Sequence, residues 1–180
     1  MHEGGDKPTF QESVLTQLDA GYNLALWMLH DEHLASDAIQ DAAFKAWRGF
    51  DSFQGGDGKS WFLAIVRTSV VDLVRRIRRG RPSVFGNSDA PVPQESKDDP
   101  PLTSLLRREH ASLVGEVVST LPEAVREILV LREMDGLSYA QISQVLDIPI
   151  GTVMSRVSRA RDAAAAAIRD KLMKERTDGV

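Results

Sequence analysis

Apolar residues recur every three or four positions along most of the chain, the spacing that places them on one face of a helix. In the first third, the pattern forms three groups, which begin at Leu15, Leu24 and Ala35. Glycines in 54–59 interrupt it, and it resumes over 61–77. No stretch alternates as a half-buried strand would. The pattern predicts three helices before the glycines and a fourth after them.

The second half of the chain predicts four more helices. Two amphipathic segments span 105–119 and 122–134, and Pro122 suits the first turn of the second. Ser138 and Gln141 have the form of a capping box, in which each side chain binds the other residue's backbone amide at a helix start. After a short turn at Asp147, a final helix is expected from Ile150 onward.

A proline-rich segment separates the two sets of helices. Five of the eight prolines fall between Arg81 and Leu102, together with serines and four acidic residues. This composition predicts a flexible, acidic linker over 81–104. The expected fold class is therefore all-α, with two small helical bundles at 10–80 and 105–172.

Composition narrows the possible functions. The chain has 180 residues, no cysteine and four scattered histidines, so we expect no disulfide, no metal site and no cofactor. No apolar run is long enough to span a membrane, and the N-terminus lacks the pattern of a signal peptide. These features predict a protein of the cytoplasm without membrane insertion.

The net charge of −4 conceals two basic stretches. Before Trp61 there are ten acidic residues and four basic ones, whereas 67–81 holds six arginines and one acid. A second stretch, 156–176, carries seven basic and three acidic residues. Two basic patches on an acidic chain indicate two contacts with a polyanion.

The last two predicted helices have the outline of a helix-turn-helix. On the final helix, Val153, Val157 and Ala160 share a face that would pack on the preceding helix. The opposite face has short side chains first and arginines later, which suits contacts with base edges and phosphates. The spacing alone fits an ordinary helical hairpin with a basic flank equally well.

Specific residues here add a family resemblance. The run Leu121–Arg161 closely resembles region 4 of bacterial sigma factors of the extracytoplasmic-function (ECF) class, with Gly136-Leu137-Ser138-Tyr139, Ile148-Pro149 and Gly151-Thr152-Val153 as the most similar positions. The resemblance implies recognition of the minus-thirty-five promoter element. The residues it points to are Ser138, Tyr139, Gly151, Thr152, Ser155, Arg156 and Arg159.

A second block, Asp37–Arg79, resembles region 2 of the same family. In that family this part docks on core RNA polymerase, which makes four polar residues of one helix the core-binding candidates: Asp37, Gln40, Asp41 and Arg48. Without the resemblance, the same residues would be read as a solvated helix face with pairs four residues apart.

Region 2 also opens promoter DNA in this family, by extracting a minus-ten base into a pocket of the loop that corresponds to 52–60. Arginines with neighbouring aromatic rings suit phosphates and unpaired bases. The candidates are Phe53, Gln54, Trp61, Arg67, Thr68, Arg75, Arg76, Arg78 and Arg79. We expect Trp61 to lie at least partly in the core rather than to contact a base, and base contact stays a more open possibility for Phe53. Thr68 stands where the family commonly has asparagine.

The resemblance implies a promoter-specificity subunit whose partners are core RNA polymerase, promoter DNA and an anti-sigma factor. No enzyme activity is expected, because the glycine-rich segment 55–60 lacks the glycine and the preceding strand of a phosphate-binding loop. Two alternatives stay open on the sequence. One is a DNA-binding regulator that does not join polymerase, and the other is an interaction protein with incidental arginines.

Overall fold

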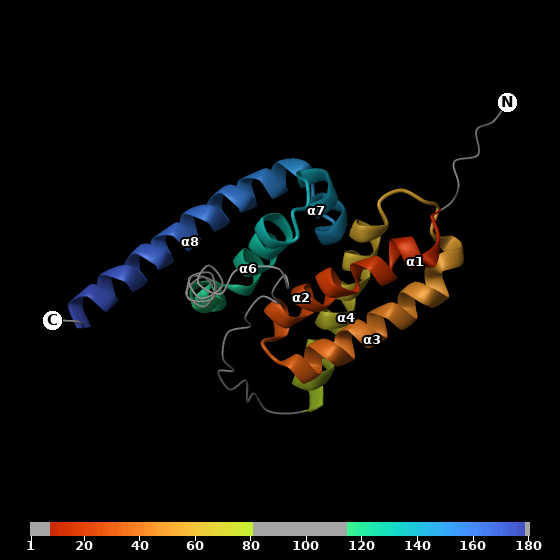
Figure 1. The fold of residues 1–180 in the computed structure, drawn as a ribbon, viewed down its shortest axis with the longest axis horizontal. Helices are drawn as coiled ribbons and strands as arrows, with labels where there is room; N and C mark the ends of the chain where they lie inside the picture. Colours follow the sequence, from red (N-terminus) through yellow and green to blue (C-terminus); the bar gives the residue numbers. More distant parts are fainter. Residues whose placement is uncertain (1–7, 81–114, 179–180) are drawn as a thin grey trace, which may run out of the picture.

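The computed structural model describes residues 8–80 and 115–178, and within these ranges all regular structure is helical. We call residues 8–80 the N-terminal unit and residues 115–178 the C-terminal unit (Figure 1). The predicted linker 81–104 and the first ten residues of the predicted helix 105–119 lie outside the described residues.

The N-terminal unit is built on three long helices that pack against one another: α2, α3 and α4. A capping carboxylate starts α3, since Asp31 Oδ1 accepts a hydrogen bond from the Leu34 amide at 2.9 Å. In order, the unit contains α1 (Phe10–Ser13), η1 (Leu15–Gln17), α2 (Leu18–Leu29), α3 (Glu32–Gly49), η2 (Phe50–Ser52) and α4 (Gly58–Gly80).

The C-terminal unit begins with residues 115–120, which are helical. They are followed by α6 (Glu123–Leu129), η3 (Val130–Met134), α7 (Tyr139–Leu146) and α8 (Ile150–Asp178). Pro122 is the N-cap of α6, one position before the predicted place. The single helix expected over 122–134 instead changes to a π-helical turn at η3.

The predicted capping box at the start of α7 is confirmed. The Ser138 amide donates to Gln141 Oε1 at 2.7 Å, and the Gln141 amide donates to Ser138 Oγ at 3.2 Å. At the other end, Asp147 adopts a left-handed conformation with φ of 52° and turns the chain into α8. Aspartate tolerates this conformation better than most residues.

The two units pack together through one continuous apolar core. Phe62, Leu63 and Val66 of α4 are fully buried, and they belong to the same cluster as Leu131 and Ile142 of the C-terminal unit. Helix α7 packs on α4, and α6 and η3 pack on α2. The all-helical prediction with two units is confirmed, but nothing in the sequence indicated that the units share a core.

Helix α8 is much longer than its contact with α6 and α7 requires. Its 29 residues span about 43 Å at 1.5 Å per residue. Ala163, Ala164 and Ala167 pack against the core, whereas Leu172 and Met173 are exposed. Figure 1 shows the far half of α8 extending away from the N-terminal unit.

Gly58 allows α1 to lie against the start of α4. A Cβ at this position would approach the Ser13 Cα to 2.8 Å, whereas a Cβ at Gly49 would meet no atom within 4 Å. We expect Gly58→Ala to lower the free energy of unfolding by about 1–3 kcal/mol through this clash. The control, Gly49→Ala, should raise it by about 0.5 kcal/mol because alanine favours the helix. Urea unfolding checks both, and equal values for the two variants would contradict the packing of α1 on α4.

Candidate nucleic-acid interface

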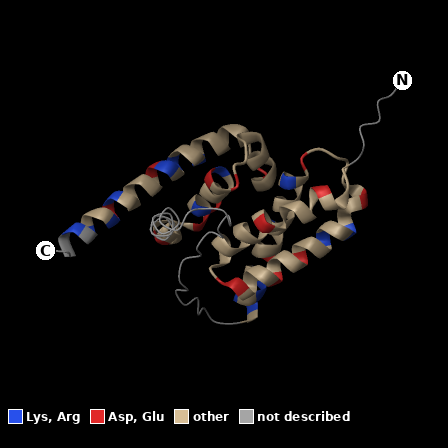
Figure 2. Ribbon diagram, viewed as in Figure 1, with Lys and Arg blue, Asp and Glu red and all other residues tan. Residues whose placement is uncertain are grey.

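The arginine-rich end of α4 projects from the N-terminal unit. Arg75, Arg76, Arg78 and Arg79 are exposed, and Figure 2 shows Lys and Arg positions gathered at this end of the helix. One weak ion pair lies among them, with Arg75 Nη1 3.8 Å from Asp72 Oδ1. The structure thus brings four of the predicted minus-ten residues together on a solvent-facing cationic end.

The other predicted residues of α4 lie further back along the helix. Thr68 is exposed and its hydroxyl donates to the Ala64 carbonyl at 2.9 Å. Arg67 Nε lies 2.6 Å from Glu127 Oε1 of the C-terminal unit. Its guanidinium therefore makes an ion pair within the protein and is separate from the exposed arginines.

The loop before α4 holds a packed aromatic cluster. The ring centroids of Phe53 and Trp61 are 4.7 Å apart, and Phe50 lies within 6.0 Å of both. Phe53 is only 6% exposed, which leaves little of its ring accessible to a base. Trp61 is partly buried against the core, as expected. Gln54 is exposed and is the more accessible of the two loop candidates.

The core-binding candidates lie on α3. Asp37, Gln40 and Arg48 are exposed. Asp41 is half-buried and pairs with Lys45 at 2.8 Å. The hydrogen bond from Lys45 lowers the pKa of Asp41, so this carboxylate keeps its charge at neutral pH.

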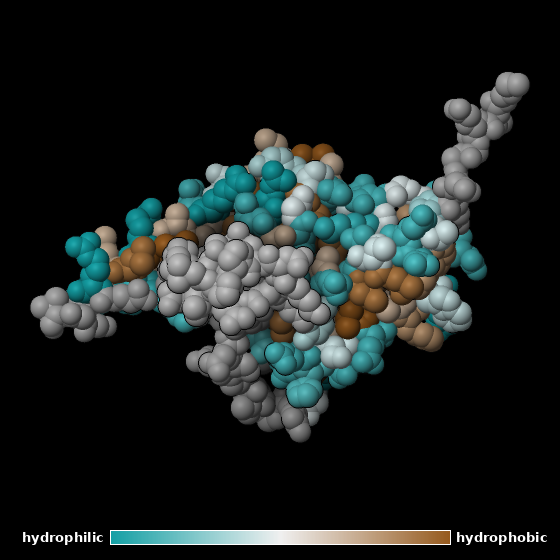
Figure 3. Space-filling view, in the orientation of Figure 1, coloured by the Kyte–Doolittle hydropathy of each residue, from teal (hydrophilic) through white to brown (hydrophobic). Residues whose placement is uncertain are grey.

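The sequence did not lead us to predict that two aromatic side chains on α3 face the solvent. Phe44 is 55% exposed and Trp47 is 65% exposed. The Arg48 guanidinium lies 5.7 Å from the centre of the Phe44 ring. Figure 3 shows an apolar area on the side of the molecule that carries α2 and α3. The available signal was that Phe44 lies between the buried Ala42 and Ala46 and that Trp47 follows Ala46, so both aromatic residues fall off the buried stripe.

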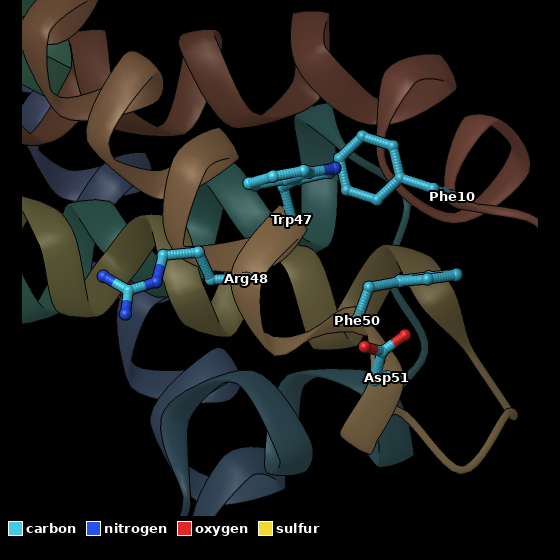
Figure 4. A pocket seen from close by; sticks show the side chains of 5 residues that line it. All are labelled: Phe10, Trp47, Arg48, Phe50 and Asp51. Atoms are coloured by element: carbon cyan, nitrogen blue, oxygen red, sulfur yellow. The ribbon is translucent and has the colours of Figure 1, made fainter.

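A surface pocket lies beside these aromatics. Its volume is about 450 Å³, and its lining residues are Phe10, Trp47, Arg48, Phe50 and Asp51. Figure 4 shows Phe10 and Trp47 close to each other in this view, with the Arg48 guanidinium pointing away from them. The pocket joins the aromatic cluster of the loop to the exposed face of α3.

Helices α7 and α8 form the predicted helix-turn-helix. Val153, Val157 and Ala160 are buried, each at most 1% exposed, as the spacing predicted. The candidate residues at the start of α8 face solvent: Gly151, Ser155, Arg156 and Arg159 are exposed and Thr152 is partly exposed. This short-chained, then cationic face suits the major groove of DNA.

The candidates at the start of α7 lie beside that face. Ser138 is exposed, and Tyr139 is partly buried. The guanidinium of Arg132 lies 4.9 Å from the centre of the Tyr139 ring. This stacking holds the start of α7 against η3.

Polar contacts connect the two units across α4. Besides the pair between Arg67 and Glu127, Lys59 Nζ donates to the Asp135 carbonyl at 2.7 Å, and Gln141 Nε2 donates to Asp57 Oδ2 at 2.7 Å. The partners are 60 to 84 residues apart in sequence. No local pattern could have paired them.

Burial shifts three ionisable groups at this contact. It raises the pKa of Glu127 against the effect of Arg67, and it raises the pKa of Asp135 to about 6, with Lys59 opposing. The pKa of His30, the C-cap residue of α2, is lowered by burial and by the Arg126 guanidinium. Apolar packing therefore stabilises the contact between the units, whereas the burial of its charged groups destabilises it.

No helix within residues 8–80 and 115–178 is long and apolar enough to cross a membrane. The same ranges contain no cluster of three histidines or carboxylates with the geometry of a metal site.

A helix-turn-helix with an exposed polar and cationic face, joined to a second helical unit with an arginine-rich helix end, defines a class of two-unit DNA-binding proteins. Comparison with protein families gives the same two units. Residues 15–80 match the family described as Sigma-70 region 2, and residues 112–163 match Sigma-70, region 4.

Relatives with known names cover most of the chain. It is 36% identical over 174 residues to RNA polymerase sigma-H factor of Pseudomonas aeruginosa, covering 93% of this chain and 90% of that protein. It is 33% identical over 135 residues to the ECF RNA polymerase sigma-E factor of Escherichia coli, covering 71% and 70%. The chain therefore belongs to the sigma-70 family of RNA polymerase sigma factors, in the ECF group, and the resemblance noted in the sequence is confirmed. Members of this family are transcription initiation factors.

Solved structures agree on the fold. The sigma factor RpoE of Bartonella quintana, in complex with the anti-sigma factor NepR, superposes with a TM-score of 0.70 at 26% identity, covering 89% of this chain and 96% of that one. CnrH, solved in complex with the cytosolic domain of CnrY, has a TM-score of 0.61 at 21% identity and covers 89% and 88%.

Burial of Asp135 gives a test of the contact between the units. Because its pKa is raised from 3.8 to about 6, the native state binds the proton more tightly, so this group lowers stability increasingly as pH rises from about 4 to above 6. We expect Asp135→Asn to raise the free energy of unfolding by about 1–2 kcal/mol at pH 7.5, and by less at pH 4.5. Thermal unfolding at the two pH values, with the exposed Asp162→Asn as control, checks this. An equal gain at both pH values would contradict it.

Proposed function

We propose that this chain is the promoter-reading subunit of an RNA polymerase holoenzyme, with separate sites for the minus-ten and minus-thirty-five elements. The observation that carries the proposal is that two solvent-facing cationic surfaces, one on α4 and one on α8, occur in a chain of this family. The units proposed are 10–80 for polymerase and minus-ten contacts and 105–172 for minus-thirty-five contacts, joined by the linker 81–104.

The minus-ten surface consists of the loop before α4 and the exposed side of α4. Arg75, Arg76, Arg78 and Arg79 would bind backbone phosphates of the opened strand. Gln54 in the loop and Thr68 on α4 are exposed hydrogen-bonding side chains and would contact bases. Phe53 and Trp61 would act by holding the loop in shape, since their rings pack on each other.

The minus-thirty-five surface is the start of α8. Ser155, Arg156 and Arg159 would reach base edges and phosphates in the major groove. The backbone around Gly151 and Thr152 would approach a phosphate, because neither residue has a bulky side chain. Ser138 and Tyr139 at the start of α7 would contact the backbone beside the groove.

Core polymerase would dock on the outer face of α3, through Asp37, Gln40, Asp41 and Arg48. The lowered pKa of Asp41 favours a charged contact at physiological pH. An anti-sigma factor is the proposed regulator, as one is bound to the related RpoE of Bartonella quintana. We propose that the protein works in the cytoplasm with polymerase and contributes no catalysis or cofactor of its own.

Run-off transcription from genomic fragments with purified core polymerase tests the proposal. The wild-type chain should give transcripts with defined start sites that core polymerase alone does not give. We expect Asp41→Arg to reduce them about tenfold, the effect of losing about 1.4 kcal/mol of polymerase binding. Its control is Asp19→Arg, which reverses an exposed carboxylate on α2. Absence of any protein-dependent transcript would overturn the proposal.

Arg156→Ala tests the minus-thirty-five surface. It should weaken holoenzyme binding to a promoter recovered in the transcription assay by about 1–3 kcal/mol and, if it binds phosphate, reduce the salt dependence of binding by about one unit. Arg169→Ala is the matched control, since it removes an exposed arginine from the same helix. Equal losses in the two variants would contradict a specific role for Arg156.

A further inference from the structure

The proposed contact of α8 with DNA depends on how this helix is rotated about its own axis. Successive residues of a helix are about 100° apart, so the proposed contact residues between Thr152 and Arg159 fall within an arc of about 100°. Hydrogen bonds to base edges are directional. A rotation of α8 by a few tens of degrees would therefore move its polar side chains away from the bases that they face.

The buried face of α8 consists of small aliphatic side chains. Val153, Val157 and Ala160 are buried, and Ala163 and Ala164 pack against the core beyond them. Apolar contact is non-directional, so a seam of such short side chains resists a small rotation only weakly. A directional contact between α8 and a fixed part of the C-terminal unit would select one orientation.

Glu133 makes such a contact. Its Oε1 accepts a hydrogen bond from Arg161 Nε at 2.9 Å and lies 2.7 Å from Arg161 Nη2. Glu133 belongs to η3, a π-helical turn in which Val130 and Leu131 are fully buried, so its backbone is anchored in the core. Two nitrogens of one planar guanidinium are held, which restrains the orientation of that group as well as its position.

Arg161 points away from the face of α8 that would contact DNA. It follows Thr152 by nine positions, which places it about 180° from that residue around the helix. Arg161 therefore cannot reach the bases that Thr152 would face. The basic stretch at the end of the chain thus contains arginines of two kinds, since Arg156 and Arg159 lie on the DNA-facing side and Arg161 does not.

The same contact reaches the start of α7. The Arg132 guanidinium lies 4.9 Å from the centre of the Tyr139 ring, and its Nη1 donates to the Leu137 carbonyl at 2.6 Å. The pKa of Arg161 is raised mainly by the hydrogen bond and charge of Glu133, and further by the side chain of Tyr139. One polar network therefore joins η3, the start of α7 and the middle of α8.

We propose that Glu133 is a positioning residue for minus-thirty-five recognition: through Arg161 and Tyr139 it sets the rotation of α8 on α7, and thereby which base edges the side chains of α8 meet. This role rests on the proposed function, because it requires α8 to lie in the major groove. Glu133 and Arg161 themselves touch no DNA. They affect the choice of promoter sequence and leave the number of phosphate contacts unchanged.

The test compares two variants that each remove one carboxylate charge paired with α8. Glu133→Gln weakens the pair with Arg161, and the matched control Glu116→Gln weakens the pair with Lys171, farther along the same helix. Each holoenzyme is measured for binding to a promoter recovered in the transcription assay and to the same fragment with a scrambled minus-thirty-five element. The ratio of the two affinities is the discrimination for that element.

We expect Glu133→Gln to lower this discrimination about threefold, the scale of a solvent-exposed ion pair. Glu116→Gln should keep the wild-type value. The slope of log affinity against log salt concentration should be the same in all three chains, because no phosphate contact is lost. Unchanged discrimination in Glu133→Gln would overturn the proposal, and so would a changed slope, since the pair would then act on phosphate contacts.

Exchange of the two charges separates positioning from direct contact. Glu133→Arg combined with Arg161→Glu has the net charge of wild type and restores an ion pair, whereas Arg161→Glu alone does not. We expect the double variant to regain most of the discrimination that Arg161→Glu loses. If Arg161 bound DNA, the double variant would be as poor as the single one, and that result would overturn the proposal.

The orientation of α8 is measured without DNA. The chain has no cysteine, so Gln144→Cys on α7 and Ala165→Cys on α8, both at exposed positions, accept a pair of spin labels. The distribution of distances between the labels should broaden in Glu133→Gln and keep its wild-type width in Glu116→Gln, while circular dichroism stays that of wild type in both. An unchanged distribution in Glu133→Gln would overturn the proposal.

The outcomes distinguish this role from the proposed function. A wild-type holoenzyme that discriminates against the scrambled element, with equal discrimination in Glu133→Gln, keeps the proposed function and overturns the role of Glu133. A wild-type chain that gives no transcript with core polymerase overturns the proposed function and the role in promoter choice together. The spin-label distances still show in that case whether Glu133 orients α8.

Discussion

The structure depends on the burial of one side of α4. Phe62, Leu63 and Val66 on this helix have no exposed surface, and α2, α3 and α7 all pack on it. Because the fully buried positions of α4 end at Val70, the arginines of the last turns extend beyond the core. The same burial fixes the loop before α4, where the packed rings of Phe53 and Trp61 continue the core toward the surface.

A second consequence is that the two units are held together by apolar packing and by charges that are expensive to bury. The ion pair between Arg67 and Glu127 bridges them, yet burial raises the pKa of Glu127 and of Asp135. Removing charges from water costs free energy that one ion pair recovers only in part.

The two cationic surfaces differ in how they are presented. On α8, the face with Ser155, Arg156 and Arg159 is open while the opposite face is buried in the helix-turn-helix. On α4, the arginine-rich end is open but the middle is covered by the C-terminal unit. The exposed aromatic side chains Phe44 and Trp47 lie on a different helix of the N-terminal unit, α3. The proposed polymerase contact and the proposed DNA contact thus use different helices of that unit.

The sequence determined the features that depend on neighbours three or four positions apart. Helical periodicity predicted an all-helical chain, although the groups beginning at Leu15 and Leu24 belong to one continuous run, η1 and α2. Ser138 and Gln141 marked the start of α7, and Val153 and Val157 identified the buried face of α8. Only the tertiary structure decided that Phe53 is buried, that Phe44 and Trp47 face solvent, and that Arg67 pairs with Glu127. The physical reason is that exposure and ion pairing depend on which helices meet. Helix packing brings together residues that are far apart in the chain, and a single sequence carries no local signal for such pairs.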